Sequence, residues 1–103
     1  MSFRPPSSIS ATPSPRDLAG LELDILAEKA GTLGQAGRLM EQKLAALRAA
    51  EPDQEGRDAL RREAADAVQA YFIQREACGI RRHQDAIAEY RIPSEVLARL
   101  GAR

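Results

Sequence analysis

The chain has little of what catalytic and metal sites need. Its 103 residues include one cysteine, one histidine and no tryptophan. A single cysteine excludes an internal disulfide framework and fits a reducing compartment. Metals such as Zn²⁺ need several thiolates or imidazoles, so Cys78, His83, Asp85 and Glu89 do not make a credible metal site. We therefore predict no metal and no other cofactor.

Long apolar runs and an excess of one charge are also absent. No run approaches the length of a transmembrane helix, and no apolar core follows Arg4 as in a secretory signal. Basic and acidic residues number fifteen each, so no net charge draws the chain to nucleic acid or to a membrane. These features predict a cytoplasmic protein without a membrane partner.

Strand-forming residues are scarce, whereas alanine, leucine and arginine are abundant. This composition predicts an all-α fold. Residues 1–14 hold three prolines and five serines with few large apolar side chains. Such a segment buries too little surface to offset its ordering entropy, so we expect a flexible tail. Residues 15–103 are expected to form a single helical domain.

The first helix is expected over residues 15–50. Ser14, Pro15 and Asp17 have the types and spacing of a capped helix start. Apolar residues and one glycine then recur at alternating steps of three and four, typical of a coiled-coil seam: Leu23, Leu26, Ala30, Leu33, Gly37, Met40, Leu44 and Leu47. Because this register does not slip, we favour one continuous helix over two short ones, although each glycine costs about 1 kcal/mol relative to alanine.

The rest of the chain alternates helices and connectors. Residues 51–56, EPDQEG, are a turn by composition, and a second helix is expected over 55–78, starting near Asp53 or Arg57. A short connection between two long amphipathic helices predicts an antiparallel hairpin. Gly79 resembles a left-handed helix stop, with a bend or continuation as alternatives. Shorter helices are expected over 80–91 and 93–100, separated at Ile92–Pro93.

The hairpin register explains the glycines. It brings residues 34–37 near two aromatic side chains of the second helix, so small residues face large ones. We interpret the group as close helix packing, and a hinge or a ligand approach are the alternatives. The residues of this packing site are Gly31, Gly34, Gly37, Tyr71 and Phe72.

Two stretches, 18–26 and 71–80, carry more apolar surface than one hairpin can cover. Either the C-terminal residues fold back over them, or a second copy completes a four-helix bundle, or both. We therefore predict a homodimer. The candidate interface residues are Leu18, Leu21, Ile25, Ile73 and Ile80.

No catalytic constellation is visible, so we expect a protein that is not an enzyme. Cys78 and His83 could act as nucleophile and base, but nothing indicates an oxyanion hole or a cleft. Cys78 is expected on the packing face of the second helix, and His83 on the solvated face of the third. Residues 75–103 carry six basic and four acidic side chains, a net charge of only +2. Binding of nucleic acid by these arginines is therefore an alternative that we rank second.

The run YFIQREACGIRRHQDAIAEYRIPSEVLARLG, with EKAGTLGQAGRLM before it, resembles small uncharacterised helical proteins found in alphaproteobacteria. The resemblance covers most of residues 17–101. It implies a helical fold and brings no catalytic residues. The sequence as a whole predicts a helical module for protein–protein interaction or self-assembly.

Overall fold

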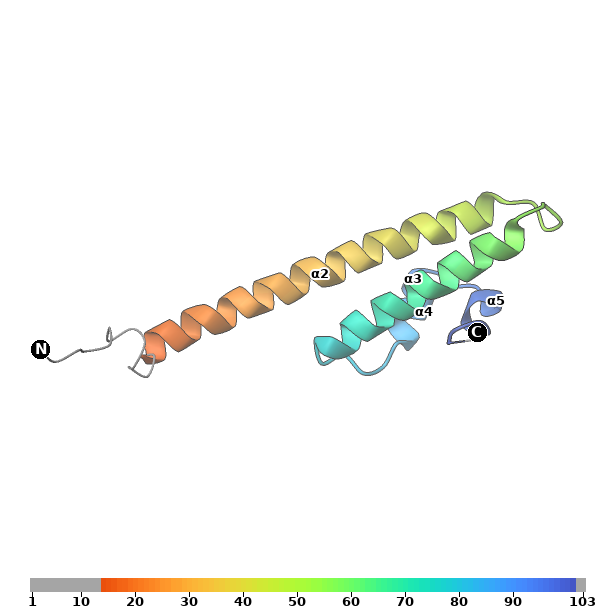
Figure 1. The fold of residues 1–103 in the computed structure, drawn as a ribbon. Coiled ribbons are helices and arrows are strands. Elements are labelled where there is room, and N and C mark those ends of the chain that lie inside the picture. Colours follow the sequence, from red (N-terminus) through yellow and green to blue (C-terminus); the bar gives the residue numbers. More distant parts are fainter. Residues whose placement is uncertain (1–13, 102–103) are drawn as a thin grey trace, which may run out of the picture.

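The computed structural model describes residues 14–101, which form a helical hairpin followed by two short helices (Figure 1). The elements are α2 (Pro15–Ala49), α3 (Arg57–Ala77), α4 (Gln84–Glu89) and α5 (Ser94–Leu97). The two long helices run antiparallel, and the described residues contain no strand. The predicted all-α hairpin is confirmed. The expected flexible tail lies, apart from Ser14, outside the described residues.

Helix α2 begins at the predicted cap. The Ser14 hydroxyl accepts a hydrogen bond from the Asp17 backbone N–H at 3.2 Å, and the Asp17 carboxylate accepts from the Ser14 backbone N–H at 3.4 Å. These two bonds satisfy backbone groups that a helix start leaves unpaired. The helix then runs without a break to Ala49. The single continuous helix predicted from the apolar register is confirmed.

Helix α3 stops at the glycine that the sequence indicated. Gly79 has a φ of +87°, a conformation that glycine adopts at little cost. The Ile80 N–H donates to the Arg75 carbonyl at 2.9 Å, and the Gly79 N–H donates to the Glu76 carbonyl at 2.9 Å. This pair of bonds is a Schellman motif, which turns the chain away from the helix axis. The expected third helix over 80–91 is therefore wrong in its start, because residues 80–83 form the connection and α4 begins at Gln84.

The core lies between α2, α3 and the C-terminal segment. Met40, Leu44 and Leu47 of α2 are at most 1% exposed, and Val68 of α3 and Val96 of α5 are fully buried. The C-terminal segment folds back along its own hairpin (Figure 1). It covers the half of the hairpin nearer the turn, since α5 packs on α3. The C-terminal residues thus cover the part of the hairpin formed by α3 and residues 33–49 of α2, which we call the body.

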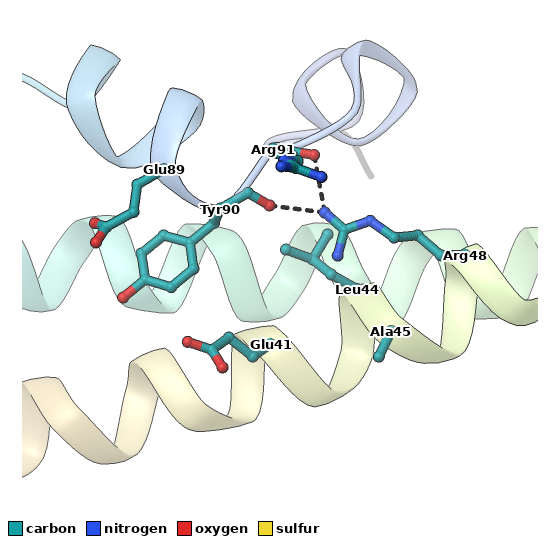
Figure 2. A pocket seen from close by; sticks show the side chains of 7 residues that line it. All are labelled: Glu41, Leu44, Ala45, Arg48, Glu89, Tyr90 and Arg91. Carbon is teal, nitrogen blue, oxygen red and sulfur yellow. Dashed lines mark hydrogen bonds between the residues drawn. The ribbon is translucent and has the colours of Figure 1, made fainter.

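A second Schellman motif closes α4, with an arginine in place of glycine. Arg91 has a φ of +52°, and the Ile92 N–H donates to the Ile87 carbonyl at 3.0 Å. Figure 2 shows Arg48 of α2 reaching across to this turn. Its Nη2 donates to the carbonyls of Tyr90 at 2.7 Å and of Arg91 at 2.9 Å. These charge-assisted bonds hold the turn against α2.

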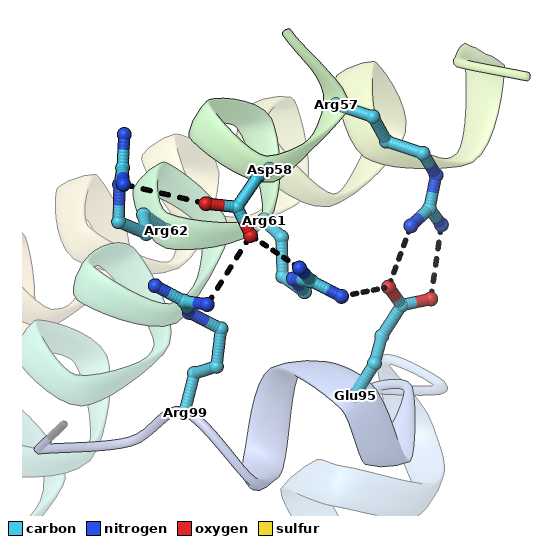
Figure 3. Close-up of polar contacts among 6 residues, drawn as sticks. All are labelled: Arg57, Asp58, Arg61, Arg62, Glu95 and Arg99. Carbon is cyan, nitrogen blue, oxygen red and sulfur yellow. Dashed lines mark hydrogen bonds and ion pairs between the residues drawn. The ribbon is translucent and has the colours of Figure 1, made fainter. Parts of the chain in front are cut away.

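Ion pairs fasten α5 to the start of α3 (Figure 3). Arg57 donates both terminal nitrogens to the Glu95 carboxylate, at 2.7 and 2.9 Å. Asp58 accepts from Arg61 of its own helix and from Arg99 at 3.2 Å. The hydrogen bonds from Arg57 and Arg61 lower the pKa of the Glu95 and Asp58 carboxyls, respectively. Both carboxylates are therefore more stable as anions in the folded chain.

Candidate functional site

The most conspicuous surface is the N-terminal half of α2, which extends beyond the rest of the hairpin (Figure 1). Every residue from 14 to 32 is exposed. Helix α3 ends beside Lys29, whose Nζ lies 3.5 Å from the Ala77 carbonyl oxygen. We call residues 15–32 the arm. At 1.5 Å per residue, a helix of this length spans about 27 Å.

Five large apolar side chains of the arm are open to solvent. The exposed fractions are 43% for Leu18, 55% for Leu21, 66% for Leu23, 43% for Ile25 and 61% for Leu26. Leu23 and Leu26 belong to the seam that is buried farther along α2, whereas the other three lie on a neighbouring face at steps of three and four. The apolar surface therefore covers much of the circumference of the arm.

The arm is poorly suited to remain alone in water. An isolated helix of roughly 15 residues is marginal even with favourable residues. Gly20 and Gly31 lie inside the arm, and each costs about 1 kcal/mol of helix stability relative to alanine. Neither has any side chain or distant backbone within 4 Å of where a Cβ would stand. The arm thus lacks the tertiary contacts that normally stabilise such a helix.

The other two predicted interface residues lie away from the arm sequence but are also exposed. Ile73 is 52% exposed, and it stands two residues after the buried Tyr71, on the opposite side of α3. Ile80 is 38% exposed and follows the glycine that ends α3. The five predicted interface residues thus divide into three on the arm and two on or just after α3.

The glycines of α2 have different surroundings. A Cβ on Gly37 would stand 3.2 Å from the Cε1 atom of the Tyr71 ring, so the helix and the ring are in close contact. A Cβ on Gly34 would meet only the Arg38 side chain, at 3.4 Å, and one on Gly31 would meet open space. Phe72 stacks instead on the ring of His83. The close packing expected for the whole group is present at Gly37 and Tyr71, because the hairpin body begins only near residue 33.

The surface at the base of the arm is apolar. Leu26, Ala30 and Leu33 of α2 line a small notch with Ala77 and Cys78 at the end of α3. A neighbouring groove runs along α2 from Ala30 to Gly37 and Glu41, with Tyr71 and Tyr90 on its other side. Both hollows continue the face on which Leu23 and Leu26 stand. The apolar surface of the arm therefore extends onto the body.

The segment after α3 is held by a cluster that sequence reasoning missed. Arg75 is buried and donates to the His83 Nδ1 at 3.2 Å, to the Arg82 carbonyl at 3.0 Å and to Asp85 at 2.8 Å. Because His83 Nδ1 accepts a bond, its Nε2 carries the proton and donates to Glu76 at 3.0 Å. The expectation that His83 lies on a solvated helix face is wrong, since only 15% of its side chain is exposed.

A ring stack between Phe72 and His83 also holds residues 80–83 against α3. Their rings stack in parallel, with centroids 4.2 Å apart. Cys78, expected on the packing face, is half-buried at the cap of α3. Within residues 14–101, no group of three or more His, Cys, Asp or Glu side chains is placed to hold a metal ion. Nor is any helix in that range long and apolar enough to cross a membrane.

Polar groups in the hollow drawn in Figure 2 make contacts within the chain that stabilise the fold. It lies between α2 and the end of α4, and Arg48 on its wall is bonded to backbone carbonyls. Interaction with the Tyr71 hydroxyl, followed by burial, raises the pKa of Tyr90 to about 12. Two of the C-terminal arginines are also used internally, since Arg75 pairs with Asp85 and Arg99 with Asp58.

The comparison with known protein families gives a match over nearly the whole chain. The matching model is described as a family of unknown function (DUF6665), and it covers residues 5–103. The chain belongs to this family. No curated protein and no solved structure matches it. Membership in DUF6665 agrees with the resemblance to uncharacterised proteins and assigns no activity, so function has to be argued from the arm and the surface at its base.

Proposed function

We propose that this protein is a non-enzymatic interaction module that binds another protein chain through its arm. The observation that carries the proposal is the row of five large apolar side chains on a helix that no other described segment covers. Burying one such side chain completely contributes about 1.5–3 kcal/mol. At their present exposure, each side chain of the arm therefore has about 1 kcal/mol still to gain.

The arrangement of these side chains supports an interface better than chance exposure does. Single exposed leucines are normal on protein surfaces, whereas a contiguous apolar patch marks a binding surface. Leu18, Leu21 and Ile25 are consecutive on one face, and Leu23 and Leu26 stand on the next. A helix that offers apolar residues on two faces fits between other helices, as in a bundle.

The alternative, binding of nucleic acid by the C-terminal arginines, has less support. Arg75 and Arg99 form ion pairs within the chain, which reduces the charge that they offer to phosphates.

We place the module in the cytoplasm, because the lone thiol of Cys78 fits a reducing compartment.

Site-specific photo-cross-linking in the cells that produce the protein tests the proposal. A benzophenone amino acid replaces Leu26 on the arm, and in a matched variant it replaces Ala46, an exposed residue of the same helix. We expect covalent adducts with a protein chain from position 26 and few from position 46. Absence of adducts from position 26, or equal yields from both positions, contradicts the proposal.

A further inference from the structure

We infer that the chain bound by the arm is the arm of a second copy of this protein, in antiparallel orientation. The inference rests on the proposed function and specifies its partner.

The apolar seam of α2 continues along the whole helix, but it is exposed in the arm and buried in the body. In heptad terms, Leu23 and Ala30 take the first core position and Leu26 and Leu33 the second. The later members Met40, Leu44 and Leu47 of the same pattern are buried against α3, which runs antiparallel to α2. The arm repeats the surface that an antiparallel helix already covers in the body. A second arm supplies a helix of the required kind. With Leu23 opposite Leu26 of the other copy, the two arms face each other over residues 20–29, and the end of α3 beside Lys29 bounds this stretch.

Charge complementarity selects the antiparallel orientation. Glu22 and Lys29 each precede a first core position by one residue, so both lie along the same edge of the seam. In an antiparallel pair, this edge of one helix faces the same edge of the other helix. With Leu23 opposite Leu26 of the second copy, Glu22 of one copy and Lys29 of the other lie two residues apart along the helix axis, which is about 3 Å. Two-fold symmetry produces this pair twice.

A parallel pairing offers no such partners. In parallel helices, a residue at this edge faces the residue five positions later in the second copy. Glu22 would then face Ala27, and Lys29 would face Gly34. Neither is charged, so a parallel dimer leaves four charges at its edges without a partner. The small residues Gly20 and Ala27 occupy the other edge, where they let two antiparallel arms approach closely.

Neither charge has a strong use within the chain. Glu22 forms no ion pair with any residue between 14 and 101, and Lys29 reaches one backbone carbonyl at 3.5 Å. By contrast, the body pairs its charges across elements, as Lys43 does with Glu63 at 2.8 Å. The arm thus presents an acidic and a basic group seven residues apart that match a second copy turned by 180°.

Charge-swap variants of the full chain test the orientation, with the dissociation constant measured by sedimentation. Glu22→Lys and Lys29→Glu each convert two attractive pairs into two repulsive ones, and we expect the dissociation constant to rise on the order of tenfold. The double variant E22K/K29E restores the pairs and the wild-type value. Asp24→Lys, with the same charge change on an exposed side of the helix away from the seam, leaves the value unchanged.

Mixing the two single variants gives the most specific readout. A 1:1 mixture of isotopically labelled E22K and unlabelled K29E should form mainly heterodimers in native mass spectrometry, because only the mixed pair combines opposite charges at both sites. Melting of E22K reports on folding separately, since Glu22 does not contact the body.

The outcomes separate this inference from the proposed function. A chain that stays monomeric, or a dimer that ignores the charge swaps, overturns the antiparallel pairing of arms. In either case adducts with a different protein from position 26 still support the interaction module. Absence of adducts of every kind contradicts both.

Discussion

The contact between Gly37 and Tyr71 leads to a prediction about stability. The Tyr71 ring already stands 3.2 Å from where a Cβ on Gly37 would lie. On its other sides, the ring packs edge-on against Tyr90, with centroids 5.6 Å apart, and beneath the Arg75 guanidinium at 5.8 Å. The ring therefore has little room to move away. A leucine at position 37 has to displace it from the core.

Two opposing effects set the magnitude. Leucine is a better helix former than glycine by about 0.8 kcal/mol. Overpacking a core site costs about 1–3 kcal/mol, and expelling the tyrosine ring forfeits its burial, worth about 1.5–3 kcal/mol. We expect Gly37→Leu to lower the free energy of unfolding by about 2 kcal/mol. For a domain of this size, that corresponds to a fall in Tm of roughly 10 °C.

Thermal and urea denaturation followed by circular dichroism measure this change. Gly31→Leu is the matched control, because the site of a Cβ on Gly31 has nothing within 4 Å. The control should melt at the wild-type temperature or slightly above it. The packing argument fails if Gly37→Leu melts at or above the wild-type temperature.

Two further predictions concern the C-terminal segment. Arg91 holds a φ of +52°, which costs a non-glycine residue about 1 kcal/mol. Arg91→Gly should therefore raise the free energy of unfolding by about 0.5 kcal/mol in urea titrations, after the greater freedom of unfolded glycine is allowed for; a clear loss would contradict this. The hydrogen bond from Arg57 lowers the pKa of Glu95 below its usual 4.5, so its stabilisation is present above that pH and is lost as the pH falls below it. Glutamine does not titrate, so in Glu95→Gln the free energy of unfolding should fall less steeply between pH 5 and 3 than in the wild type. The same slope in both proteins would refute the role of this pair.

Local signals made much of the fold predictable. The cap at Ser14, the stop at Gly79 and the turn at 51–56 depend on residues close together in sequence, and each is present in the structure. The seam of α2 was equally readable, because a steady apolar period requires a continuous helix. These features explain why the hairpin and its register follow from the sequence.

The features that sequence reasoning missed depend on contacts between distant segments. The left-handed conformation of Arg91 carries no glycine to indicate it, and it is held by Arg48, which is 43 residues away. The stack of His83 on Phe72 arises because the chain reverses at Gly79. The sequence indicates the stop at Gly79, but a local signal does not show that residues 80–83 then pack back against α3 instead of starting the next helix.

The candidate site shows the same division. The apolar excess of the arm is visible in the sequence, and Leu23 and Leu26 belong both to that excess and to the seam. The structure leaves them exposed because α3 ends opposite Lys29. Which part of a seam is covered depends on the length of the partner helix, and one Schellman motif at Gly79 sets that length here.

The exposure of the arm follows from how firmly the remainder of the chain is held. Residues 79–92, if they continued α3, would lie along the arm in the hairpin register. They turn back instead, and Arg75 anchors the connection while Arg48 anchors the end of α4. Covering the arm from within would break both anchors and expose Val96, which is fully buried. Because these contacts hold the C-terminal segment on the body, no segment between residues 14 and 101 covers the arm, as the proposed interaction with another chain requires.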